Sequence, residues 1–125
     1  MSAALRIEAR GAVHALTLAR PEKMNSLSAD LVEALIAAVD DAATQGAQVI
    51  VLRGEGRNFS AGFDFGDWES QSEGDLLLRF VRIETLLQRV AASPCLTVGL
   101  AHGRNFGAGV DPVSYTHLTL PTNRE

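Results

Sequence analysis

The chain has 125 residues, of which 46% are hydrophobic and 21% are charged, as expected for one soluble globular domain with an apolar core. Its formal net charge of −4, with both signs scattered, argues against nucleic acid and against an anionic membrane surface as partners. Cys95 is the single cysteine, which excludes an intrachain disulfide and favours a reducing compartment. The N-terminus lacks the apolar core of a signal peptide, and no apolar run approaches the ~20 residues of a membrane span, so we expect a cytoplasmic protein.

The first residues predict a β-hairpin. Apolar and polar side chains alternate over residues 5–9 and 13–19, on either side of Gly11, which is typical of two antiparallel strands joined by a glycine turn. Pro21 ends the second strand, because proline lacks a backbone N–H and restricts the residue before it. The hairpin therefore leads into a loop.

Two segments predict amphipathic helices. The first follows Ser28, whose side chain suits an N-cap, and ends at Gly46. The second covers residues 76–91 and stops before Pro94, after a polar segment over residues 67–75. The predicted apolar face of the second helix consists of Leu76, Phe80, Ile83, Leu87 and Val90, with Arg79, Arg82, Glu84 and Arg89 elsewhere.

Two short apolar runs predict buried strands. Residues 48–52 (QVIVL) are typical of a strand that is buried on both faces, and residues 95–101 (CLTVGLA) predict another buried strand. Each run opens into a glycine-rich loop, residues 54–66 and residues 103–109, where peptide groups can turn out of the sheet toward a ligand. Such a loop, taken alone, is more often a packed turn than a binding site.

The order of these elements indicates an α/β fold. Two strands followed by alternating helices and strands imply crossover helices and a mainly parallel sheet. Ligands of such sheets bind where loops leave the carboxyl ends of the strands, and both glycine-rich loops leave such ends. This shared position favours a functional interpretation of the two loops.

Three segments together resemble the enoyl-CoA hydratase/isomerase, or crotonase, superfamily. Residues 16–28 (LTLARPEKMNSLS) are similar to its "TLNRP…NAL" entry into the first helix. Residues 57–65 (RNFSAGFDF) resemble its "F-S/C-A-G-x-D" loop, and residues 98–111 (VGLAHGRNFGAGVD) its "V-x-G-x-A-x-G-G-G-x-E" segment. The resemblance implies a crotonase-like ββα superhelical spiral, of which residues 1–111 would form the N-terminal part.

The resemblance also implies a chemistry. In this family two backbone N–H groups hold the thioester oxygen of an acyl-coenzyme A and stabilise the enolate that forms. By alignment the donors here are the amides of Phe63 and Ala108, and each such donor lowers a barrier by roughly 3–4 kcal/mol. Asp111 aligns with the first catalytic glutamate of the hydratases, although aspartate is one methylene shorter. Among the activities of this family, the resemblance favours that of an enoyl-CoA hydratase.

Coenzyme A would lie along two segments of this chain. The family places it against the residues that align with Glu22, Lys23 and Met24, and near Ser60, Ala61 and Asp64 through backbone contacts. Lys23, helped by Arg20 or Arg57, could meet phosphate oxygens. Asn25 and Ser28 are expected to serve as turn and cap residues rather than as ligands. We expect no metal and no separate cofactor, since coenzyme A is part of the substrate.

The last residues do not fit the family. Residues 112–125 (PVSYTHLTLPTNRE) lack a helical apolar stripe and resemble the translation of a transposon-end sequencing adapter joined to a truncated reading frame. The alternative is a genuine divergent strand and tail. The predicted fold excludes residues 112–125. The second glutamate of the hydratase pair would fall about twenty residues beyond Asp111, so we expect this fragment to be inactive. The resemblance also implies that the full-length parent is a homotrimer or hexamer.

Other functions stay open from the sequence. Within the family, an enoyl-CoA isomerase, hydrolase or decarboxylase would use the same two amides. A non-catalytic acyl-CoA binding or assembly protein would keep the shape without the carboxylate pair. An unrelated nucleotide-binding α/β protein is a weaker alternative, because neither glycine-rich loop has the spacing and lysine of a phosphate-binding loop.

Overall fold

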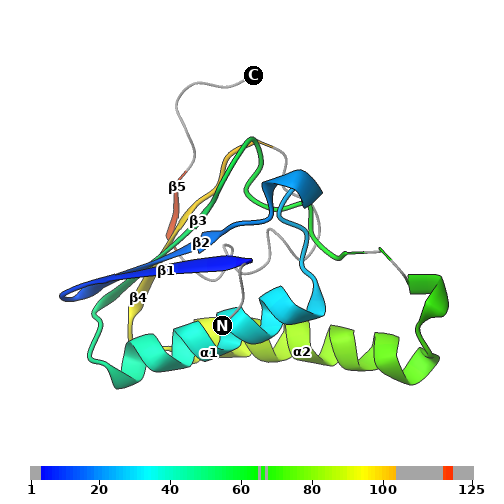
Figure 1. Ribbon diagram of the computed structural model, residues 1–125. Helices are drawn as coiled ribbons and strands as arrows, with labels where there is room; N and C mark the ends of the chain where they lie inside the picture. Colours follow the sequence, from blue (N-terminus) through cyan, green and yellow to red (C-terminus); the bar gives the residue numbers. More distant parts are fainter. Residues whose placement is uncertain (1–3, 65, 67, 104–116, 120–125) are drawn as a thin grey trace.

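The computed structural model of the chain describes residues 4–64, 66, 68–103 and 117–119, which form one sheet with two helices packed beneath it (Figure 1). None of the helices in this described part is long and apolar enough to cross a membrane. In chain order the elements are β1 (Leu5–Arg10), β2 (Val13–Leu18), a 3₁₀ helix η1 (Pro21–Lys23), α1 (Ala29–Thr44), β3 (Val49–Gly54), a 3₁₀ helix η2 (Trp68–Ser70), α2 (Glu73–Ala92), β4 (Leu96–Leu100) and β5 (His117–Thr119).

The sheet follows the chain from one edge to the other, in the order β1-β2-β3-β4-β5. β1 and β2 pair antiparallel, whereas β2–β3, β3–β4 and β4–β5 pair parallel. The predicted hairpin and the mainly parallel sheet are therefore confirmed. The crossovers β2-α1-β3 and β3-α2-β4 run in the same direction along the sheet. Since such crossovers are right-handed, both helices lie on one face, as Figure 1 shows.

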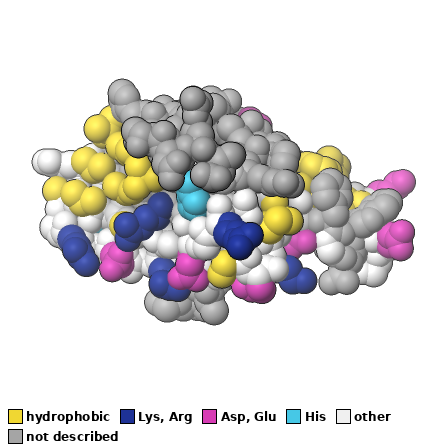
Figure 2. All heavy atoms as spheres, turned by 90° about the horizontal axis from the view of Figure 1, so that it is seen from above, with side chains coloured by type: hydrophobic (Ala, Val, Ile, Leu, Met, Phe, Trp, Pro, Cys, Tyr) yellow, Lys and Arg dark blue, Asp and Glu magenta, His cyan; other side chains and the backbone are white. Residues whose placement is uncertain are grey.

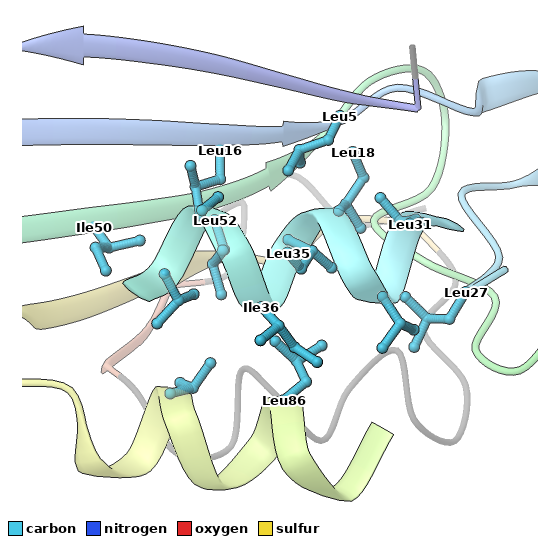
Figure 3. Close-up of a cluster of buried hydrophobic side chains, with 14 of the residues drawn as sticks. Leu5, Leu16, Leu18, Leu27, Leu31, Leu35, Ile36, Ile50, Leu52 and Leu86 are labelled. Carbon is cyan, nitrogen blue, oxygen red and sulfur yellow. The ribbon is translucent and has the colours of Figure 1, made fainter. Parts of the chain in front are cut away.

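The core lies between this face of the sheet and the two helices (Figure 3). Leu16 from β2, Ile50 from β3, Leu31 from α1 and Leu86 from α2 are all fully buried there. The prediction that residues 48–52 are buried on both faces of the sheet is wrong within the part of the chain that the structure describes. Val49 and Val51 on the other face of β3 are only half-buried, since both helices cover the same side.

Helix α2 begins three residues earlier than its apolar pattern predicted. Ser72 and Asp75 form a capping box, in which the Ser72 hydroxyl accepts from the Asp75 amide at 3.0 Å and the Asp75 carboxylate accepts from the Ser72 amide. The predicted apolar face is also partly wrong. Arg79 is buried, whereas Phe80 is 54% exposed beside three other exposed apolar side chains of this helix. These are Leu77, Leu78 and Val81.

Residues 117–119 form the last strand of the sheet. Leu118 pairs with Gly99 of β4 in a parallel register. The predicted fold excludes residues 112–125, so this short strand is an addition to the predicted sheet.

The surface carries charges of both signs. Seen from above the view of Figure 1, Lys and Arg side chains are interspersed with Asp and Glu side chains (Figure 2). This mixture agrees with the scattered charges of the sequence, and any anionic ligand would require a local site.

Asn25 ties the loop after β2 to the loop after β3, and it is fully buried. Its side-chain oxygen accepts from the Arg20 amide at 2.7 Å, and its amide nitrogen donates to the carbonyls of Glu55 and Asn58, both at 2.8 Å. Its backbone has a φ of 53°, a left-handed conformation that asparagine tolerates. Asn25 is thus the turn residue that the sequence predicted, with partners in both loops.

Asn25→Ala should strongly destabilise the chain. The substitution removes three buried hydrogen bonds and places alanine at a positive φ, so we expect the free energy of unfolding to fall by about 3 kcal/mol or more. Urea denaturation followed by circular dichroism measures this loss. Met24→Ala is the matched control, because Met24 is exposed and also has a φ of 53°. The control should change stability by less than about 0.5 kcal/mol, and an equal loss in both variants would contradict this role of Asn25.

Candidate functional site

The two glycine-rich loops lie side by side at the carboxyl ends of β3 and β4. The Phe59 amide donates to the His102 carbonyl at 2.9 Å, and His102 Nε2 lies 2.9 Å from the Gly56 carbonyl oxygen. Gly103 has a φ of 65°, and a Cβ atom there would come within 2.0 Å of the Arg57 carbonyl oxygen. Only glycine therefore fits at this contact. The predicted meeting of the two loops is confirmed as far as Gly103.

Phe63 sits on the first loop in a short β-bridge with Leu27. The Leu27 amide donates to the Gly62 carbonyl at 2.6 Å, and the Asp64 amide donates to the Leu27 carbonyl at 3.3 Å. The bridge thus uses the peptide groups on either side of Phe63 and does not use the Phe63 N–H itself. Gly62, with a φ of 88°, makes the turn that precedes it. This arrangement fixes the direction of the peptide group at Phe63.

The two segments that were predicted to hold coenzyme A are in contact. The Ala61 amide donates to the Met24 carbonyl at 2.9 Å. Glu22 and Lys23 lie on η1 with exposed side chains, next to this contact. The structure therefore brings the end of η1 and the first loop together, and their binding of coenzyme A stays a prediction.

Ser60 supports the loop from inside. It is fully buried, and its hydroxyl donates to the Asn25 carbonyl at 2.8 Å and accepts from the Gly62 amide at 3.1 Å. Its side chain thus holds the turn that leads to Phe63, which leaves only backbone contacts for a ligand at this position.

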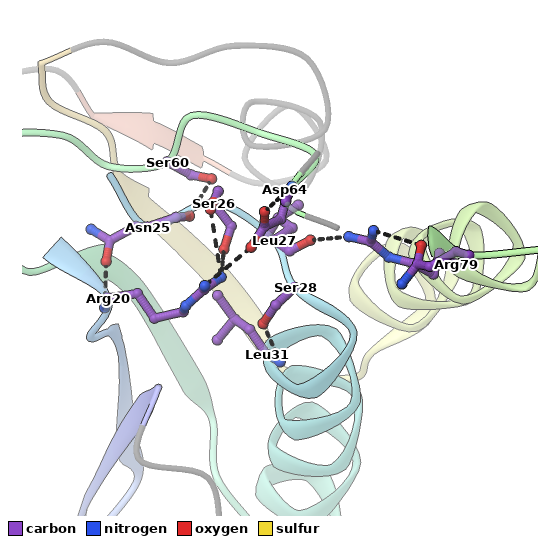
Figure 4. Close-up of polar contacts among 11 residues, drawn as sticks. Arg20, Asn25, Ser26, Leu27, Ser28, Leu31, Ser60, Asp64 and Arg79 are labelled. Carbon is purple, nitrogen blue, oxygen red and sulfur yellow. Dashed lines mark hydrogen bonds and ion pairs between the residues drawn. The ribbon is translucent and has the colours of Figure 1, made fainter. Parts of the chain in front are cut away.

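Asp64 forms a partly buried ion pair with Arg20, with a distance of 3.0 Å between a guanidinium nitrogen and a carboxylate oxygen (Figure 4). Arg20 also donates to the Ser26 carbonyl at 2.7 Å, and the Gly66 amide donates to Asp64 at 2.8 Å. Burial acts to raise the pKa of Asp64, but the bonds from Gly66 and Arg20 and the charges of Arg20 and Arg79 together lower it. Arg20, a predicted phosphate partner, is held inside the fold instead.

Two of the predicted site residues, Ala108 and Asp111, lie outside the described residues. The convergence of the Phe63 and Ala108 amides on one oxygen therefore stays a prediction. Within the described residues there is no group of three or more His, Cys, Asp or Glu side chains that could hold a metal ion.

Sequence reasoning missed the position of Arg79. This side chain is only 9% exposed, and it donates to the Leu27 carbonyl at 3.1 Å from the middle of the predicted polar face of α2 (Figure 4). The spacing contained the signal, because residue 79 lies three positions after Leu76 and four before Ile83. Its charge is the reason that the sequence pattern predicts it outside the apolar face.

Asp64→Asn tests the ion pair through its pH dependence. Because the pKa of Asp64 is lowered by folding, its stabilising contribution is complete above the ordinary pKa of aspartate and is lost as the pH falls through the lowered value. We expect the variant to lose about 1–2 kcal/mol of unfolding free energy at pH 7 and less in acid, as measured by urea denaturation at each pH. Asp41→Asn, on an exposed part of α1, should change little at either pH. A deficit in Asp64→Asn that is the same at both pH values would contradict the ion pair.

Comparison with known proteins identifies the family of the chain. The Enoyl-CoA hydratase/isomerase family matches residues 8–120. The chain is 38% identical over 100 residues to the "Probable enoyl-CoA hydratase echA6" of Mycobacterium bovis. The aligned region covers 79% of this chain and 39% of that protein. It is 28% identical over 117 residues to the mitochondrial "Delta(3,5)-Delta(2,4)-dienoyl-CoA isomerase" of Dictyostelium discoideum, with 84% and 40% covered.

A solved structure is similar over most of the chain. The "putative enoyl-CoA hydratase/isomerase" from Bordetella parapertussis has a TM-score of 0.90 and 58% identity, covering 96% of this chain and 54% of that one. The chain thus spans about two fifths of the length of these curated relatives and about half of that structure. From its matched residues and its crotonase-type α/β fold, the chain belongs to the enoyl-CoA hydratase/isomerase family.

Proposed function

We propose that this chain carries the acyl-CoA binding and oxyanion-stabilising part of an enoyl-CoA hydratase. The observation that supports this most directly is the position of Phe63. Its peptide group is fixed by the bridge to Leu27, on the loop that leaves the carboxyl end of β3 and that contacts His102 after β4 through Phe59. Ligands of open α/β sheets bind at such strand ends, and a fixed N–H there can polarise a carbonyl.

In the proposed reaction the Phe63 and Ala108 amides hold the thioester oxygen. Water adds to the β-carbon of the enoyl group, the α-carbon gains a proton, and negative charge develops on that oxygen in between. Each amide supplies roughly 3–4 kcal/mol of stabilisation to the charged state. Asp111 is proposed as the carboxyl group that moves the proton.

Coenzyme A is proposed to lie across the contact between η1 and the first loop. Lys23 is exposed there, at the last position of η1, and Met24 is 51% exposed beside it. A lysine ammonium is a suitable partner for a phosphate oxygen, and backbone groups around Ala61 and Asp64 would contact the nucleotide. We further propose a cytoplasmic homotrimer or hexamer as the working assembly.

An isomerase is the second candidate. The Dictyostelium relative is named as a dienoyl-CoA isomerase. Moving a double bond needs a proton to leave one carbon and return to another, which a single carboxyl group such as that of Asp111 can perform. The same two amides would stabilise the dienolate in between.

Turnover of crotonyl-CoA by the intact gene product tests the hydratase. We expect the absorbance of the conjugated enoyl thioester to fall as water adds. A protein that only moves the double bond of a 3-enoyl-CoA or a dienoyl-CoA would be an isomerase. Binding of acyl-CoA without turnover of either substrate would contradict both and identify a binding protein.

Phe63→Pro tests the backbone donor in the same assay. Proline removes the N–H, so we expect kcat to fall by about 10²–10³-fold. Phe63→Tyr is the control, because it retains both the amide and the aromatic ring, and it should retain most of kcat. Both variants need a cooperative melt like that of the unchanged protein. Equal activities in the two folded variants would contradict a role for this amide.

Lys23→Ala tests the coenzyme A contact. Loss of one charge-assisted hydrogen bond should raise the dissociation constant for coenzyme A by about tenfold and leave kcat unchanged. Isothermal titration calorimetry measures the affinity. Arg10→Ala removes an exposed cation at the hairpin turn, away from η1, and is the charge-matched control. Equal weakening by both variants would show a general charge effect and contradict a local contact.

A further inference from the structure

The buried guanidinium of Arg79 lies against the loop that presents Phe63. Its carbon Cζ is 4.0 Å from the centroid of the Phe63 ring, which is a cation–π contact. A terminal nitrogen of the same group donates to the Leu27 carbonyl at 3.1 Å, as Figure 4 shows. Arg79 therefore contacts both residues of the bridge that fixes the peptide group of Phe63.

The Leu27 carbonyl is shared between two donors. It accepts from the Asp64 amide within the bridge at 3.3 Å and from Arg79 at 3.1 Å. The neighbouring residue on α2 adds a second ring contact, since Phe80 stacks on Phe63 with centroids 4.6 Å apart and an angle of 13° between the rings. Helix α2 thus supports the Phe63 loop through two consecutive side chains.

Packing alone does not require a cation at this position. Within the described residues Arg79 has no carboxylate at ion-pair distance, although its charge acts on Asp64. One terminal nitrogen donates to the Gln71 side chain at 3.4 Å, and the Nε atom has no hydrogen-bond partner. A buried charge without a close carboxylate is costly, and an apolar side chain of similar length often does as well or better for stability. The Leu27 carbonyl would still accept from the Asp64 amide after such a change.

We propose that Arg79 is a positioning residue for the oxyanion-binding amide of Phe63. This inference rests on the proposed function, and Arg79 acts through Phe63 and Leu27 rather than on the substrate. The cation–π contact of Arg79 with the Phe63 ring and its hydrogen bond to the Leu27 carbonyl resist rotation of the peptide groups on either side of Phe63. The N–H of Phe63 then stays aimed at the place where negative charge develops, with no reorganisation during the reaction.

Three variants of the intact gene product test this role by steady-state kinetics with crotonyl-CoA. Arg79→Met retains an unbranched apolar stem and removes the charge and the donor, so we expect kcat to fall by about tenfold to a hundredfold with KM within about twofold. Arg79→Lys retains the cation over the ring and should recover most of kcat. Arg82→Met makes the same change one turn along α2, where the arginine pairs with Glu33 near the surface, and should keep kcat.

The comparison among the variants decides between positioning and packing. A purely structural role predicts equal kcat for Arg79→Met and Arg79→Lys at matched stability. That result would overturn the proposal, as would unchanged kcat in Arg79→Met or an equal loss in Arg82→Met.

Amide hydrogen exchange keeps this inference separate from the reaction itself. In Arg79→Met we expect the Leu27 and Asp64 amides, which are hydrogen-bonded in the bridge, to exchange about tenfold faster, while the amides of β2 and β3 keep their rates. This measurement needs no turnover, so it still tests the positioning role if crotonyl-CoA is not a substrate. Unchanged exchange at both residues in a folded variant would overturn the proposal.

Discussion

The candidate site depends on the backbone contacts that join the loop after β2 to the loop after β3. Asn25 is the centre of this junction, because its side chain bonds one loop at Arg20 and the other at Glu55 and Asn58. The bridge between Leu27 and Phe63 continues the same junction toward α1. Without these bonds neither the contact between η1 and Ala61 nor the direction of the Phe63 peptide group would be defined.

Much of the fold could be predicted from local patterns. Alternation before Pro21, the cap at Ser28 and the glycine after α1 correctly identified the hairpin and the first helix. The order of helices and strands was sufficient for a mainly parallel sheet, because a crossover helix leaves few other topologies. The glycine-rich loops were correctly placed at neighbouring strand ends for the same reason.

What the sequence could not show depends on partners that are distant along the chain. Arg20 pairs with Asp64, and Arg79 bonds the Leu27 carbonyl, so neither arginine is a simple surface cation. The start of α2 was missed because Ser72 and Asp75 lie in a polar segment without an apolar pattern. At the site, sequence patterns identified the loop and its backbone, whereas the side chains that hold the loop in place became visible only in three dimensions.

The order of the strands has a consequence for synthesis. The strands have the same order in the sheet as in the chain, so each strand that leaves the ribosome can pair with the strand synthesised before it. Folding can therefore proceed from the N-terminus. The junction at Asn25 is an exception, since its two carbonyl partners follow it by 30 and 33 residues. The side-chain amide of Asn25 therefore has its two acceptors only after β3 and the loop that follows it have been synthesised, later than the hairpin and α1.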